Sequence, residues 1–181
     1  MEKYLVSAEQ VAAAAIAQDA RLTDAKDVKR RVLVCGHSPG QHAPGCAAAI
    51  VRSLAERAYR RPVTKAEVRE LAALVTKVTR DGGPFDEGVQ LAAEAILVSP
   101  NFLFRIEGNR DSGPNALRTI NDFELATRLS YFLWSSMPDD ELFALAGRGA
   151  LREPDVLKQQ VARMISDEKA ARFVKNFAGQ W

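Results

Sequence analysis

The chain has 181 residues, with 25 Lys and Arg against 23 Asp and Glu, which gives a formal net charge of +2 at pH 7. Its 47% hydrophobic and 27% charged residues exclude a disordered chain and leave enough apolar surface for one ordinary domain or two small ones. So small a positive surplus argues against nucleic acid as a partner, and no apolar run is long enough to span a bilayer.

The first part of the chain shows apolar residues at helical spacing, which predicts a mainly α structure. Ser7 with Gln10, and Thr64 with Glu67, have the spacing of capping boxes and mark two helix starts. The predicted helices run over 11–20, from 46 to 60, from Thr64 to the turn at Asp81, and from Phe85 to near Ser99. Val32–Val34 is the one convincing β-like run, so the prediction allows at most one short β segment.

Residues 108–116 have the composition of a linker, because glycine, proline and polar residues replace the apolar ones. The sequence therefore predicts two small helical bundles. The first is an Ala-rich domain over 1–107, with a loop of cysteines and histidines at 35–46. The second is an aromatic-rich domain over 117–181.

Four helix starts are predicted in the second domain. Asn121 with Glu124 forms another capping box, Pro138 and Pro154 suit first helical positions, and Ser166 is a candidate cap. Four short helices of this kind are typical of a small bundle.

The loop at 35–46 holds both cysteines and both histidines of the chain. A disulfide between Cys35 and Cys46 is one interpretation, and two free thiols are another. The third is a zinc site made by Cys35, His37, His42 and Cys46, although their spacing is not that of a recognised zinc finger or ribbon. The spacing alone leaves these alternatives open.

No complete catalytic motif is present in the sequence, so no catalytic residue is predicted. Arginine offers a planar fork to anions, and aromatic rings offer stacking surfaces, but both more often serve helix ends and cores. The candidate ligand-binding residues are Arg60, Arg61, Arg105, Arg128, Tyr131 and Trp134.

Four stretches together resemble the tandem helical domains of unknown function in large planctomycete-type cytochrome c proteins. These stretches are Ala58–Thr64, Ala95–Arg105, Leu129–Leu142 and Asn176–Trp181. The resemblance implies an exported, periplasmic or similarly located protein, in which a separate domain carries c-type haem, and export favours the disulfide. The chain itself contains no Cys-x-x-Cys-His haem motif. The family pattern continues beyond Trp181, so we expect a middle-region fragment that is truncated at its C-terminus.

The resemblance supplies no catalytic residues, and the expected function is a non-catalytic scaffold or interaction module. Its expected partners are other domains of the same polypeptide and a redox partner protein, with no nucleic acid and no membrane span. One alternative is part of an oxidoreductase or polymer-acting enzyme with a pocket between the two domains. The other is a small zinc-binding module.

Overall fold

The computed structural model of the chain describes residues 2–20, 32–35, 42–105, 107, 119–177 and 179. It divides into two compact units, unit 1 over residues 1–106 and unit 2 over residues 107–181. All regular secondary structure in the described ranges is helical, which confirms the mainly α prediction. The predicted linker, 108–116, falls outside the described residues.

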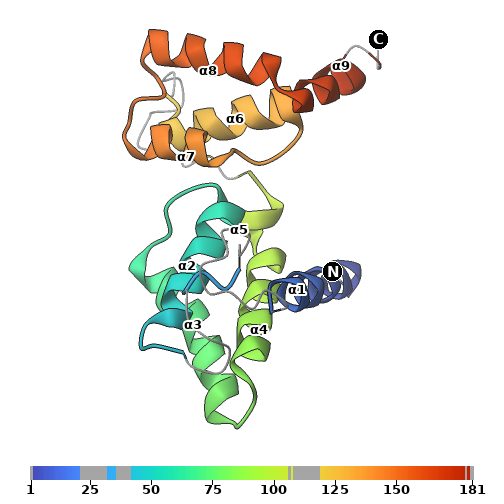
Figure 1. Cartoon of the computed structure of the whole chain (residues 1–181), viewed down its shortest axis with the longest axis vertical. Helices are drawn as coiled ribbons and strands as arrows, with labels where there is room; N and C mark the ends of the chain where they lie inside the picture. The colour runs from blue at the N-terminus through green and yellow to red at the C-terminus, as the bar shows by residue number, and fades with distance from the viewer. Residues whose placement is uncertain are drawn as a thin grey trace, which may run out of the picture. The chain divides into compact units, whose positions relative to one another are not determined.

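Unit 1 is built around one central helix. Its elements are α1 (Glu2–Ala20), α2 (Cys46–Tyr59), α3 (Lys65–Arg80), α4 (Phe85–Val98) and the single turn α5 (Pro100–Leu103). Helix α4 packs against α1, α2 and α3. Figure 1 shows α2, α3 and α4 running alongside one another, while α1 crosses α4.

The core of unit 1 lies between α2, α3 and α4. Its most deeply buried side chains are Ile50, Val51, Ala55, Val75, Val89, Ala92 and Ile96. In α4 the buried Val89, Ala92 and Ile96 recur every three or four residues, which is the helical spacing that the sequence showed. Thr64 and Glu67 form the predicted capping box at the start of α3.

Two local predictions in unit 1 were wrong. Helix α1 begins at Glu2, and Ser7 lies inside it with its hydroxyl donating to the Lys3 carbonyl 2.9 Å away. A serine hydroxyl can bond four residues back along a helix, so its presence does not by itself mark a start. Val32–Val34 forms a turn, in which the Val34 amide donates to the Val32 carbonyl and Leu33 is buried in the core.

Unit 2 is arranged around α6 (Asp122–Trp134). The other elements are α7 (Asp140–Gly147), α8 (Pro154–Ser166), the 3-10 turn η1 (Glu168–Ala170) and α9 (Ala171–Phe177). Helix α6 contacts α7, α8 and α9 (Figure 1). The largest fully buried side chains are Trp134, Leu142, Leu151 and Met164.

The helix starts of unit 2 agree with the sequence in two cases and differ in two. Asn121 forms the predicted capping box, and Pro154 stands in the first turn of α8. Helix α7 begins one residue after its cap Asp139, which places Pro138 ahead of the helix. Ser166 ends α8, and Asp167 is the residue whose side chain accepts the next amide, from Lys169. Ser166 instead donates its hydroxyl to the Ala162 carbonyl four residues back, at 3.1 Å.

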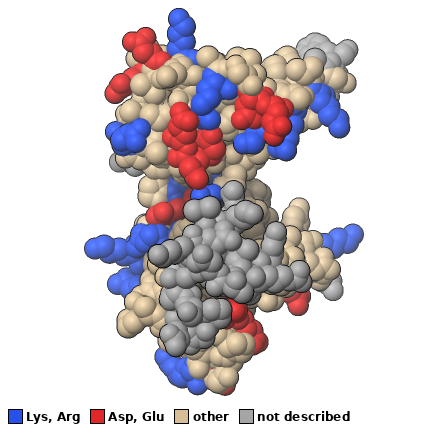
Figure 2. Space-filling view, viewed as in Figure 1, with Lys and Arg blue, Asp and Glu red and all other residues tan. Residues whose placement is uncertain are grey.

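The surface of both units carries charges of both signs. On the face that Figure 2 shows, Lys and Arg side chains are interspersed with Asp and Glu side chains over each unit. The small net charge is therefore not gathered into one patch on that face. None of the helices within the described ranges combines the length and the apolarity that a membrane crossing requires.

Gly88 of α4 approaches the backbone of α3 closely. A Cβ added there would lie 2.9 Å from Val75 Cα and 3.0 Å from the Val75 carbonyl oxygen. We expect Gly88→Ala to lower the free energy of unfolding by about 1–3 kcal/mol, because backbone atoms cannot rotate away. Urea unfolding followed by circular dichroism measures it.

Gly147→Ala in α7 is the matched control, since a Cβ there has no neighbour within 4 Å. Alanine favours a helix over glycine by up to about 1 kcal/mol, so this variant should be neutral or more stable. Equal losses in both variants would contradict the close approach of α4 to α3.

Candidate functional site

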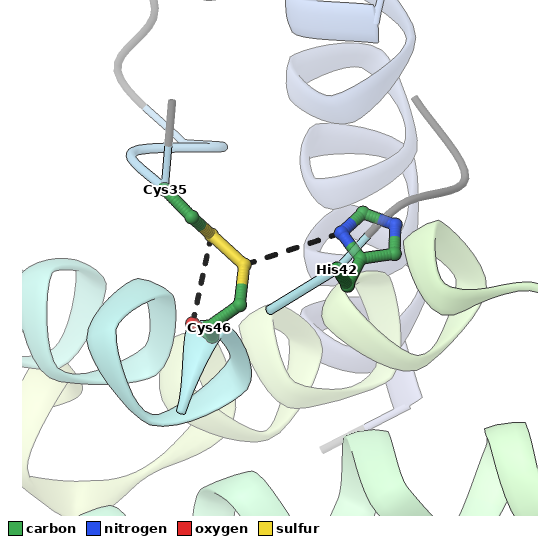
Figure 3. Close-up of a disulfide and its surroundings, with 3 residues drawn as sticks. All are labelled: Cys35, His42 and Cys46. Atoms are coloured by element: carbon green, nitrogen blue, oxygen red, sulfur yellow. Dashed lines mark hydrogen bonds between the residues drawn. A yellow bond between two sulfur atoms is a disulfide. The ribbon is translucent and has the colours of Figure 1, made fainter. Parts of the chain in front are cut away.

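The cysteine loop is joined by a disulfide between Cys35 and Cys46, as Figure 3 shows. The bond confirms the predicted disulfide and removes the alternative of free thiols, because no described cysteine is free. It closes a loop with a sequence separation of 11. A loop of this length stabilises the folded state by roughly 3 kcal/mol in the chain-entropy model.

The two sulfur atoms lie in different surroundings. Cys46 is the first residue of α2 and is 4% exposed, whereas Cys35 follows the buried Leu33 and is half-buried. The His42 Nδ1 atom lies 4.0 Å from Cys46 Sγ (Figure 3). The His42 ring also stacks on Phe85 of α4, with ring centroids 3.6 Å apart. His42 is thus held between one sulfur atom and the core.

The zinc alternative needs the same sulfur atoms in another chemical form. Zinc binds thiolates, so Cys35 and Cys46 would first have to be reduced. His37, the fourth predicted ligand, falls outside the described residues. Over the part of the chain that the structure describes, His, Cys, Asp and Glu side chains form no group of three or more suited to a metal ion.

Arg60 is a buried residue at the end of α2. It is 7% exposed, and its Nη2 donates to the carbonyls of Asn101, Phe102 and Phe104 at 3.0, 3.2 and 3.1 Å. The last carbonyls of a helix have no partner within it, and here Arg60 supplies one for α5. We call this set of contacts the Arg60 clamp. The backbone of Arg60 itself is left-handed, with φ 57°. This conformation ends α2 and turns the chain toward α3.

Arg61 makes an ion pair with Glu67. Its Nη1 and Nη2 donate to the two carboxylate oxygens at 3.2 and 2.7 Å, and Nη2 also donates to the Asn101 side chain at 3.1 Å. The hydrogen bond from Arg61, aided by the Thr64 amide and hydroxyl, lowers the pKa of Glu67 to about 2 against burial. The contact between Arg61 and Asn101 joins 58–64 to 95–105, two of the stretches that carry the family resemblance.

The lowered pKa of Glu67 predicts that the stability of the fold depends on pH. Because the folded pKa lies below the ordinary value of 4.5, the pair stabilises the fold above that value and loses its effect as pH falls toward 2. Glu67→Gln should lower the free energy of unfolding by about 1 kcal/mol at pH 7, because solvent screens an ion pair near the surface. Urea unfolding at pH 7, 4 and 3 should show the two proteins converging, and a constant difference would contradict the assignment.

The remaining candidate residues also have structural surroundings. Arg128 is exposed and makes a bidentate pair with Glu107, at 2.8 and 2.6 Å, and Arg105 is exposed. Tyr131 is half-buried. Trp134 is fully buried, and its Nε1 donates to the Met164 carbonyl at 2.9 Å. Trp134 is therefore a core residue of unit 2.

Sequence reasoning missed a polar network in unit 2. Arg163 donates to Asp139 at 2.7 and 3.3 Å and to Gln160 at 2.8 Å, and Gln160 donates to Glu141. Burial raises the pKa of Asp139, but the hydrogen bonds from Arg163 and the Leu142 amide outweigh it, so this pKa lies below its usual value. These groups tie α8 to the start of α7.

A second missed contact involves the buried carboxylate of Asp122. It accepts the Leu151 amide at 2.9 Å and pairs with Arg152, which fixes the chain between α7 and α8. Both networks join residues about twenty to thirty positions apart. Hydrophobic periodicity predicts only local structure, so it does not predict these contacts.

The last motif contact lies between α6 and α9. Phe132 packs edge-on against Phe173 at 5.0 Å, and Phe173 stacks on Phe177 at 5.2 Å. Asn176 also donates to the Ser135 hydroxyl at 2.8 Å. The motif 129–142 therefore meets the helix that carries the start of motif 176–181.

These features define a class, namely two small all-helical domains in tandem. Residues 46–107 match the family model described as PSD5, protein of unknown function (DUF1595). Residues 120–181 match the model described as PSD4, protein of unknown function (DUF1592). The two matches, one in each unit, fit the tandem domains of unknown function that the resemblance implied. No curated protein and no solved structure matches it.

Proposed function

We propose that the chain is a non-catalytic helical module of an exported protein, and that it serves as a scaffold or an interaction surface. The observation that carries this proposal is the Arg60 clamp. Arg60, one of the candidate ligand-binding residues, directs its guanidinium to three carbonyls of its own unit.

The other motif residues support the same proposal. Arg61 is bound to Glu67, and Trp134 is bound to Met164 within the core. A side chain that donates its hydrogen bonds within its own unit has fewer donors left for a ligand. The motifs that mark the resemblance are thus explained by packing.

The disulfide supports export, since such bonds persist mainly in oxidising compartments. A neighbouring domain with c-type haem, and a redox partner protein, are proposed from the family resemblance. In that arrangement the two helical units hold or present the haem domain.

The test uses the polypeptide that carries this chain, prepared with and without residues 1–181. We expect its haem spectrum and its turnover in a screen of oxidoreductase and polymer-cleaving assays to be the same in both forms. Loss of turnover with an intact haem spectrum would overturn the proposal and favour an enzyme.

A single substitution in the intact polypeptide distinguishes a scaffold from a substrate-binding site. Arg128→Ala removes an exposed guanidinium of the candidate set without touching a core, and should leave turnover unchanged. A loss of turnover with unchanged folding would show that this side chain contacts a substrate.

A further inference from the structure

The disulfide of unit 1 is built asymmetrically. Cys46 Sγ is buried at the start of α2 and has the His42 imidazole beside it, whereas Cys35 is half-buried in the turn that precedes the loop. Figure 3 shows the imidazole on the side of Cys46 and the Cys35 sulfur directed to the Cys46 carbonyl. The two sulfur atoms are therefore not equivalent toward an incoming thiol.

The start of α2 is suited to negative charge. Gly45 precedes the helix and offers no side-chain oxygen to the first-turn amides, and the first turn holds no acidic residue. In contrast, the Thr64, Asn121 and Asp139 side chains cap α3, α6 and α7. The positive end of the α2 dipole therefore faces Cys46, and a thiolate at this position is stabilised by it.

The imidazole is the second, independent group that favours charge on the same sulfur. Stacking on Phe85 at an interplanar angle of 16° fixes the plane of the His42 ring. Its Nδ1 lies 4.0 Å from Cys46 Sγ, within reach of a hydrogen bond to sulfur. An N–H at Nδ1 donates to a thiolate more strongly than to a disulfide sulfur, because a charged acceptor strengthens the bond.

We propose that Cys35–Cys46 is a thiol–disulfide exchange site that accepts two electrons from a dithiol reductant. A thiolate of the reductant attacks Cys35 Sγ, the sulfur–sulfur bond breaks, and Cys46 leaves as the thiolate. The second thiol of the reductant then attacks the mixed disulfide. The reductant leaves as a disulfide, and the protein keeps two thiols with the two protons.

Solvent access and leaving-group stability both favour attack on Cys35 Sγ with Cys46 as the leaving group. The attacked sulfur belongs to the more exposed cysteine, and the departing sulfur belongs to the cysteine that the helix and His42 stabilise. In thiol–disulfide exchange the more stable thiolate leaves faster. Attack on Cys46 would have neither advantage.

The first experiment maps the attacked sulfur in the unmodified, oxidised chain. The folded protein is treated briefly with limiting glutathione, quenched with acid, and its adducts are mapped by mass spectrometry. We expect glutathione on Cys35 and a free thiol at Cys46. Glutathione on Cys46, or no reaction unless denaturant is added, would overturn the proposal.

The second experiment measures the rate of reduction by dithiothreitol under native conditions. His42→Phe keeps a ring against Phe85 and removes the nitrogen, so we expect reduction to slow about threefold to tenfold. If His42 merely shields the disulfide, the rate should stay the same or rise, and that result would overturn its role. Circular dichroism confirms that the variant is folded, and the adduct map of the unmodified chain tests the site independently.

Discussion

Arg60→Ala is expected to lower the free energy of unfolding by about 2–4 kcal/mol, the range for removing a buried charged donor. The substitution leaves the carbonyls of Asn101, Phe102 and Phe104 without the guanidinium that they share. These groups end α5 in a part-buried site, where water replaces the lost donor incompletely. Urea unfolding of the chain followed by circular dichroism gives the value.

Two further variants isolate the cause. Arg60→Gly relieves the left-handed backbone at φ 57°, so it should be more stable than Arg60→Ala by about 1 kcal/mol while remaining below the unmodified chain. Arg128→Ala, which removes an exposed arginine, should barely change the unfolding midpoint. If Arg60→Gly were as stable as the unmodified chain, the clamp would contribute only about the 1 kcal/mol that glycine gains in the backbone, and the expected 2–4 kcal/mol would be contradicted.

Trp134→Ala should be the most damaging single change in unit 2, with a loss of about 3–5 kcal/mol. The indole is fully buried, and its ring is also flanked by the Lys169 ammonium at 4.4 Å and the Arg163 guanidinium at 5.4 Å. Truncation therefore opens a cavity and removes the partner of the Met164 carbonyl. Thermal unfolding followed by circular dichroism measures this loss.

Phe132→Ala is the matched control on the same helix. Phe132 is 57% exposed, so removing its ring should cost clearly less than removing Trp134. Trp134→Phe, which keeps an aromatic ring but loses the hydrogen bond, should fall between the two. Equal melting temperatures for Trp134→Ala and Phe132→Ala would contradict the placement of Trp134 in the core.

The sequence was most informative where structure depends on neighbouring residues. Thr64 with Glu67, and Asn121 with Glu124, were found from spacing, because a capping box is complete within four positions. Ser7 with Gln10 has the same spacing and marks no helix start, since α1 already runs through it. A local pattern thus predicts a possible cap, and the preceding chain decides its use.

The contacts of Arg60 could not be read from spacing. Its three partners lie 41 to 44 positions further along the chain, so only the packing of α2 against α5 brings them together. The ion pair of the neighbouring Arg61 with Glu67, in contrast, spans only six positions. The two adjacent arginines both reach Asn101, but Arg60 donates to backbone carbonyls of 101–104, whereas Arg61 pairs with the Glu67 carboxylate.

The disulfide was one of three interpretations that the cysteine spacing left open. The burial of Leu33 in the core brings Cys35 to the start of α2, with a Cα–Cα distance of 5.6 Å to Cys46. That distance is ordinary for a disulfide. The position of His42 against only one of the sulfur atoms follows from its stacking on Phe85, a residue 43 positions away whose contact no loop motif indicates.

Nuclear magnetic resonance of the Arg60 guanidinium shows whether this motif side chain is bound within its own unit. In the ligand-free chain we expect slowly exchanging Nη protons with nuclear Overhauser effects to residues 101–104. Rapid exchange with solvent and free rotation of the guanidinium would show instead that Arg60 is not held by these carbonyls.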